Sequence, residues 1–114
     1  MVETEPFLKQ AATLWVEKER QEFVDFIAVN PLAGAEIIGT GGMRKIRWTR
    51  PGMGKRGGAR VIYFYYNETA PVYLLTVYAK NKKEDLRPQE KSAFRKVVEA
   101  IKTQMSERQK AQKS

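Results

Sequence analysis

The sequence contains no cysteine and no histidine. Without these side chains there is no thiolate or imidazole for a structural zinc site, no cysteine nucleophile or thiol redox centre, and no imidazole for acid–base catalysis. We therefore expect no metal and no cofactor. Any catalytic chemistry must come from the remaining side chains and the backbone.

Long hydrophobic runs are also missing. No apolar run approaches the roughly 18 residues of a membrane span, and the first ten residues, MVETEPFLKQ, lack the basic and then apolar regions of a secretory signal. We expect a cytoplasmic protein without membrane contact. With 114 residues, 42% of them hydrophobic, the chain is long enough to form one domain whose hydrophobic core needs no disulfide or metal ion to stabilise it. The sequence predicts this domain over residues 1–105, followed by a polar, flexible tail over residues 106–114.

Acidic residues become scarce after the first third of the chain. Residues 1–43 hold seven acids and three bases, whereas residues 44–114 hold six acids and eighteen bases. This asymmetry indicates an acidic side and a basic side, the latter facing an anionic ligand. The alternative is that surface lysines only keep the protein soluble.

The basic character is concentrated in residues 39–66, GTGGMRKIRWTRPGMGKRGGARVIYFYY. Between Met43 and Arg60 this stretch has no carboxylate and seven cations: Arg44, Lys45, Arg47, Arg50, Lys55, Arg56 and Arg60. The neighbouring glycines let the backbone approach a ligand closely. Together these features point to a polyanion, with phosphate as the group that is bound.

Periodicity predicts two helices before this stretch and one helix after it. The first pair runs from Pro6 to Asn30, where the following proline disfavours the α region. The last helix begins near Pro88. Its predicted buried stripe has i, i+3, i+4, i+7 spacing: Phe94, Val97, Val98 and Ile101.

Three strands are predicted between the helices, over residues 43–48, 60–66 and 72–80, with a weak edge strand over residues 1–5. Alternation in the first of the three places Lys45 and Arg47 on one face and Arg44 on the other. In the second, Arg60 and Ile62 share one face. The third is almost continuously apolar, which is typical of a strand inside the sheet.

Metal-free cleavage of RNA is compatible with this composition. The RNA's own 2′-hydroxyl attacks the adjacent phosphorus, and the protein aligns the attack, stabilises the charge on the phosphate oxygens and helps protons move. The candidate side chains come from the glycine-rich loop, one strand start and one strand end: Lys55, Arg56, Arg60 and Lys80. Antiparallel folding brings such positions together. A lysine would serve as base, or the reaction would rely on positioning and electrostatics.

Each candidate also has a purely structural interpretation. Arg60 could be a surface cation on a sheet with one solvent-exposed face. Lys80 could keep the exposed end of its strand from pairing with another chain. The tyrosines of the strands are more often packing residues than platforms for bases. The glycines do not fit the G-x-x-x-x-G-K-[ST] pattern of a nucleoside-triphosphate site, and the carboxylates offer no pair suited to a glycosidase or a metal nuclease.

Three blocks of the sequence, GTGGMRKIRW, GKRGGARVIYFYY and YLLTVYAKNKKEDL, followed by a closing helix, closely resemble the HigB branch of the RelE-like toxins of bacterial type II toxin–antitoxin systems. The resemblance covers residues 31–101. It implies an α+β fold in which N-terminal helices pack on a small, mainly antiparallel sheet, with a C-terminal helix. It also implies a messenger-RNA endonuclease that enters the ribosomal A site and cuts by metal-independent 2′-hydroxyl attack. The implied partner is a HigA-like helix-turn-helix antitoxin in a toxin–antitoxin hetero-oligomer.

The resemblance also assigns roles to residues. Arg60 matches the arginine proposed to stabilise the phosphate in the transition state, Lys80 a strand-end lysine, and Lys55 and Arg56 the basic tip. Basic residues on the first strand and after the third are expected to contact RNA: Arg44, Lys45, Arg47, Lys82 and Lys83.

The chain departs from the better-known RelE pattern at two positions. Asn81 stands where that branch often has an arginine, and Leu86 stands where it has a catalytic tyrosine. The proton-transfer group is left open among Lys80, Lys82 and Asp85.

Two other functions compete with the toxin hypothesis. A non-catalytic RNA- or DNA-binding module would use the same basic sheet and show salt-sensitive binding without cuts. A regulatory protein would use the basic groove only for an acidic protein partner.

Overall fold

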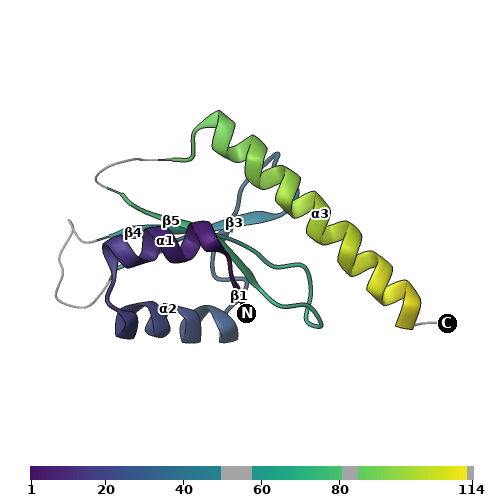
Figure 1. Ribbon diagram of the computed structural model, residues 1–114, viewed down its shortest axis with the longest axis horizontal. Helices are drawn as coiled ribbons and strands as arrows, with labels where there is room; N and C mark the ends of the chain where they lie inside the picture. Colours follow the sequence, from purple (N-terminus) through teal and green to yellow (C-terminus); the bar gives the residue numbers. More distant parts are fainter. Residues whose placement is uncertain (50–57, 81–84, 113–114) are drawn as a thin grey trace.

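The computed structural model describes residues 1–49, 58–80 and 85–112. This part of the chain folds into helices on both faces of one five-stranded sheet of order β1-β5-β4-β3-β2 (Figure 1). The elements, in chain order, are β1 (Val2–Glu3), α1 (Glu5–Leu14), α2 (Glu17–Val29), β2 (Ala35–Glu36), β3 (Met43–Trp48), β4 (Ala59–Phe64), β5 (Tyr73–Ala79) and α3 (Pro88–Gln112). Among the strands of the described residues only β1 and β5 pair in parallel, so the predicted α+β fold with a mainly antiparallel sheet is confirmed.

The sheet has an apolar core on each face because its strands alternate. Val61 and Tyr63 of β4 pack with Phe7, Phe23 and other residues of α1 and α2. The intervening β4 residues face α3, whose contribution to the second core is Val98, Ile101 and Met105, with Phe94 at its margin. The predicted division of the β4 side chains between two faces is therefore confirmed.

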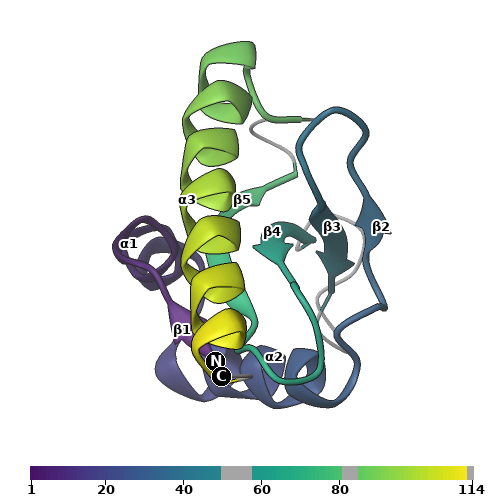
Figure 2. The same cartoon turned by 90° about the vertical axis from the view of Figure 1, so that its right-hand side faces the viewer.

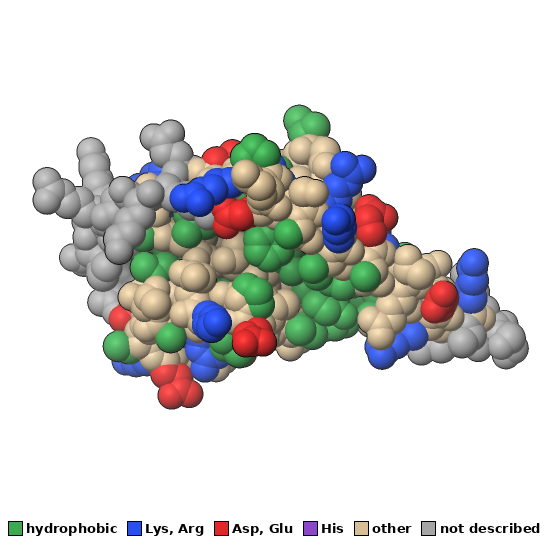
Figure 3. All heavy atoms as spheres, turned by 45° about the horizontal axis from the view of Figure 1, so that its top comes forward, with side chains coloured by type: hydrophobic (Ala, Val, Ile, Leu, Met, Phe, Trp, Pro, Cys, Tyr) green, Lys and Arg blue, Asp and Glu red, His purple; other side chains and the backbone are tan. Residues whose placement is uncertain are grey.

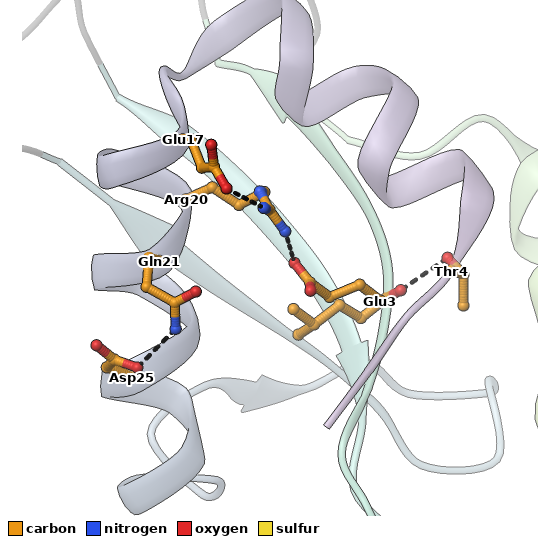
Figure 4. A network of polar contacts seen from close by, with 7 residues as sticks. Glu3, Thr4, Glu17, Arg20, Gln21 and Asp25 are labelled. Atoms are coloured by element: carbon orange, nitrogen blue, oxygen red, sulfur yellow. Dashed lines mark hydrogen bonds and ion pairs between the residues drawn. The ribbon is translucent and has the colours of Figure 1, made fainter.

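Polar contacts fasten the N-terminal helices to the sheet edge. Thr4 caps α1, its hydroxyl accepting from the Phe7 N–H at 3.5 Å and donating to the Leu74 carbonyl of β5 at 2.7 Å. Arg20 of α2 forms an ion pair with Glu3 of β1 (Figure 4). These contacts connect β1, α1 and α2 to the outer side of β5.

Helix α3 differs from its prediction in two ways. Val97 is 43% exposed, while Met105 is 5% exposed, so the buried stripe runs through Phe94, Val98, Ile101 and Met105 rather than through Val97. The helix also continues to Gln112, where the sequence predicted a fraying tail from residue 106. Good helix-forming residues beyond the Met105 anchor, among them Glu107, explain the extension. Figure 3 shows hydrophobic side chains next to the C-terminal part of α3, which projects from the rest of the domain.

The turn between β2 and β3 supports the start of β3. Its three glycines have positive φ angles of 80°, 78° and 119°, at Gly39, Gly41 and Gly42, a conformation that suits glycine. The Thr40 hydroxyl is buried in the turn, donates to the Ile37 carbonyl at 2.6 Å and accepts from the Met43 N–H at 3.2 Å. This turn fixes where β3 begins and hence which way its basic side chains point.

None of the helices within the described ranges is long and apolar enough to span a membrane.

Candidate functional site

The register of β3, β4 and β5 brings three strand ends together. Arg60 of β4 lies directly opposite Arg47 of β3 on one side and Tyr78 of β5 on the other. Residues paired in this way have Cα atoms about 4.5–5.5 Å apart and side chains on the same face of the sheet. Arg47, Arg60 and Tyr78 therefore form one row across three strands, on the face that carries α3.

Lys80 extends this row by one step. Its backbone N–H donates to the Gly58 carbonyl at 3.1 Å, so the β4–β5 ladder reaches one residue beyond Ala79. Because Lys80 follows Tyr78 by two residues, strand alternation assigns it to the face of Arg60. Diagonal neighbours of this kind are about 7–8 Å apart. The predicted meeting of Arg60 and Lys80 at one end of the sheet is thus what the register produces.

Gly58 lets the Arg47 side chain lie against the backbone. A β-carbon built on Gly58 would lie 3.3 Å from Arg47 Nε and 3.6 Å from its Nη2. Arg47 itself is exposed, whereas Lys45 and Arg60 are half-buried. Figure 2 shows β5, β4 and β3 side by side in this order, with α3 drawn in front of β5. An anion approaching from solvent would meet Arg47 first and Arg60 behind it.

Arg60 has an unusual environment for a charged side chain. Its Nε is buried, and no acceptor in the described part of the chain lies within hydrogen-bond distance of it. Its neighbour Tyr78 is 8% exposed. Burial raises the pKa of Tyr78 to about 12, with the charges of Asp85 and Glu90 acting in the same direction and the charge of Arg60 acting against them. Tyr78 is therefore a neutral phenol beside a permanently charged guanidinium.

Asp85 is a carboxylate on which this group of cations acts. Burial acts to raise its pKa, but the hydrogen bond from the Leu86 N–H and the charges of Lys91, Lys45 and Arg60 together hold it below its usual value. Asp85 also pairs with Lys91 of α3 at 3.8 Å. It is thus ionised at neutral pH and balances part of the charge of cations from three elements.

Arg44 lies apart from the other predicted RNA-binding residues. It is paired with Tyr63, whose ring belongs to the core under α1 and α2. Arg44 Nη1 donates to the Gly34 carbonyl at 2.7 Å. The Tyr63 hydroxyl accepts from the Gly34 N–H at 2.8 Å and donates to the Pro31 carbonyl at 2.7 Å. Arg44 therefore secures the chain between α2 and β2 on the opposite face from Arg47 and Arg60.

Several predicted site residues fall outside the described residues: Lys55, Arg56, Lys82 and Lys83. Leu86, at the position of the tyrosine in the RelE pattern, is 4% exposed and packs in the core under α3. The sequence alone predicts a packing role for Tyr78. Its spacing of two from Lys80 on the same strand was the signal that could have placed it in the site.

The described residues include no group of three or more carboxylates that could hold a metal ion. Among the described residues, the row offers instead positive charge from β3 and β4, a lysine at the end of β5 and the nearby carboxylates of Asp85 and Glu90. Guanidinium groups bind phosphate oxygens through paired N–H donors. These features define a small basic α+β domain suited to binding a phosphate group at one end of its sheet.

A comparison with protein-family models identifies the family of this domain. The family model described as the RelE toxin of the RelE / RelB toxin–antitoxin system matches residues 8–113, which is almost the whole chain. The chain belongs to this family. It is therefore a toxin of a toxin–antitoxin system, with an antitoxin as its partner, and it belongs to a family whose members are generally endoribonucleases.

Proposed function

We propose that the protein is a ribosome-dependent endoribonuclease of the HigB branch, which cuts messenger RNA in the ribosomal A site and so inhibits translation. The observation that carries this proposal is the row of Arg47, Arg60 and Tyr78 with Lys80 at the same strand ends. Its antitoxin would be a HigA-like helix-turn-helix protein in a hetero-oligomer. The site of action would be the cytoplasm.

The cleavage step needs no metal. The 2′-hydroxyl oxygen of the RNA forms a bond to the adjacent phosphorus and loses its proton, and the bond from phosphorus to the 5′-oxygen of the next nucleotide breaks. That oxygen takes up a proton. The products are a 2′,3′-cyclic phosphate and a 5′-hydroxyl end. The negative charge that develops on the non-bridging oxygens is where cationic donors stabilise the transition state most.

The described side chains divide this work by position. Arg60, half-buried behind the entrance, binds the non-bridging oxygens, and exposed Arg47 and half-buried Lys45 hold the RNA backbone. The Lys80 ammonium group protonates the leaving oxygen. Asp85, kept ionised by its cationic neighbours, accepts a proton. Further phosphate contacts would come from the remaining predicted cations: Lys55, Arg56, Lys82 and Lys83. Arg44 has a structural role, because it binds the Gly34 carbonyl on the other face of the sheet.

Expression in a bacterial host without the antitoxin tests this function. The wild-type protein should arrest growth, and primer extension should show new 5′ ends in translated messages. Arg60→Ala should abolish both effects while the protein remains folded by circular dichroism. Arg108→Ala, which removes an exposed cation from the far end of α3, is the matched control and should remain toxic.

Other outcomes would favour the competing functions. Salt-sensitive binding of naked RNA or DNA with no cut products, even with ribosomes present, would identify a non-catalytic nucleic-acid-binding module. Tight binding to an acidic protein without nucleic-acid affinity would identify a regulatory protein.

A further inference from the structure

Helix α3 has different charges on the two sides of its buried stripe. One side carries three cations at intervals of four and seven residues, which keep side chains on the same side of a helix: Lys91, Arg95 and Lys102. We call these three residues the basic flank of α3. The corresponding positions on the other side are Glu90, Val97 and Gln104. Charges that only keep a protein soluble are interspersed in sign, so the basic flank calls for a further explanation.

Contacts near both ends of the basic flank show which way it faces. Lys91 pairs with Asp85 at 3.8 Å, and the charge of Lys45 on β3 acts on the same carboxylate. Three helical turns later, Lys102 Nζ lies 3.2 Å from the point at which Gly41, in the turn between β2 and β3, would carry a β-carbon. The basic flank therefore faces the β3 side of the sheet.

The other side of α3 faces the opposite edge of the sheet. Glu90 lines a cleft of about 290 Å³ together with Gln10 and Thr13 of α1 and with residues at the end of β5. Since β4 lies between β5 and β3, the two sides of α3 face different parts of the sheet. The cations of the helix thus lie on the side of the strand that carries Lys45 and Arg47.

Positive charge prevails along the basic flank. The carboxylates of Asp85 and Glu99 offset part of it, because Asp85 pairs with Lys91 and Glu99 reaches the same Gly41 position as Lys102, at 3.0 Å. The ion pairs formed between described residues include Lys91 but neither Arg95 nor Lys102. The last two cations therefore remain available for an anion from outside the protein.

We infer that the basic flank of α3 is a second phosphate-binding surface, which holds the backbone of an RNA strand beyond the phosphate that is cut. This inference rests on the proposed function. The eleven residues from Lys91 to Lys102 span about 16 Å along the helix axis, so the flank reaches phosphates of more than one nucleotide. Such contacts position a strand without reading its sequence.

Salt-dependent binding of a short single-stranded RNA tests the inference apart from cleavage. The probe is a fluorescent oligonucleotide with 2′-O-methyl groups, which has no 2′-hydroxyl to attack the phosphate. Each phosphate contact adds about 0.7 to the steepness of log K against log salt for a single strand. Arg95→Ala and Lys102→Ala should each reduce the steepness by about this amount. Lys96→Ala removes an exposed cation of the same helix outside the flank and should leave it unchanged.

Two results would overturn the inference. The first is a steepness in Arg95→Ala and Lys102→Ala equal to that of the wild type. The second is an equal reduction in Lys96→Ala, which would show general attraction by the charge of the protein. Arg95→Lys, which keeps the charge, should retain the wild-type steepness. Equal unfolding midpoints in circular dichroism check that the variants are folded.

Binding to ribosomes identifies the source of the strand. Affinity is measured for ribosomes that carry a 2′-O-methylated messenger in the A site and for ribosomes without a messenger. A loss in Arg95→Ala confined to the first identifies the messenger, and an equal loss on both identifies ribosomal RNA. Wild-type affinity of Arg95→Ala and Lys102→Ala on both would reject the surface even if the protein cuts RNA. A loss without any cutting by the wild type would support the surface and reject the proposed nuclease alone.

Discussion

Arg47 and Arg60 lie directly opposite each other in the β3–β4 ladder, on the same face of the sheet. Like charges in this arrangement destabilise a sheet, so a fold optimised only for stability would avoid the pair. An anion bound between the two side chains would remove the repulsion. We interpret the repulsion between the two arginines as a loss of stability in the free protein that accompanies their role in phosphate binding.

Replacing one of these arginines should therefore make the free protein more stable and less toxic. Arg47→Thr should raise the free energy of unfolding by about 0.5 kcal/mol, the typical size of a cross-strand pair effect, and should weaken growth arrest. Urea unfolding followed by circular dichroism measures the first effect. Arg47→Lys keeps the charge and should leave stability unchanged; a loss of stability in Arg47→Thr would contradict the repulsion.

Gly58 should be required for activity more than for folding. An added methyl group would lie 3.3 Å from Arg47 Nε, and a long side chain can yield at its end. Gly58→Ala should therefore keep its unfolding free energy within about 0.5 kcal/mol while the displaced Arg47 lowers cleavage several-fold. Wild-type cleavage by a folded Gly58→Ala protein would show that the position of Arg47 does not matter.

Gly34 should show the opposite behaviour. A β-carbon there would lie 2.7 Å from the Tyr63 hydroxyl and 2.8 Å from the Lys45 carbonyl oxygen. Gly34→Ala should reduce the free energy of unfolding by about 1–3 kcal/mol, the usual cost of overpacking. In Gly39→Ala the added methyl group meets no atom within 4 Å at a φ angle of 80°, so this control should show only the left-handed strain, about 1–2 kcal/mol. Equal unfolding midpoints for wild type and Gly34→Ala would refute the packing argument.

Asp85 should make stability depend on acid pH. Its pKa in the folded protein is below the usual 3.8, so the folded state binds its proton less tightly than the unfolded state does. Its contribution to stability is present above about pH 4 and is lost as pH falls through the lowered pKa. Because the side chain is 48% exposed, Asp85→Asn should cost at most about 0.5 kcal/mol at pH 7, and this cost should shrink as the pH falls below about 4. A difference between the two proteins that stays constant in acid would contradict this assignment.

The strand faces could be predicted from the sequence because alternation has a period of two residues. Lys45 and Arg47 lie on one face and Arg44 on the other, as expected. The two-residue strand β2 and the register irregularity between Ile62 and Tyr63 have no pattern long enough to be detected. These features depend on tertiary pairing rather than on local preference.

The basic residues of the candidate site could be predicted from the sequence, but its neutral residue Tyr78 could not. A run of cations without carboxylates favours a phosphate site whatever the fold around it. By contrast, Tyr78 looks the same in sequence as the packing tyrosine Tyr63, and only the register shows which ring faces Arg60. Similarly, Val97 and Met105 both fit a helical stripe, and the crossing of α3 over the sheet decides which of them is buried.

Arg60 and Lys80 should act on the same phosphate, and a double-mutant cycle measures whether they do. Single-turnover cleavage on programmed ribosomes is measured for the wild type, Arg60→Ala, Lys80→Ala and the double variant. Residues that act as a unit are strongly non-additive, so we predict that the double variant cuts at about the rate of the slower single variant. Two losses that multiply independently, or a wild-type rate in either single variant, would show that Arg60 and Lys80 do not act together on one phosphate.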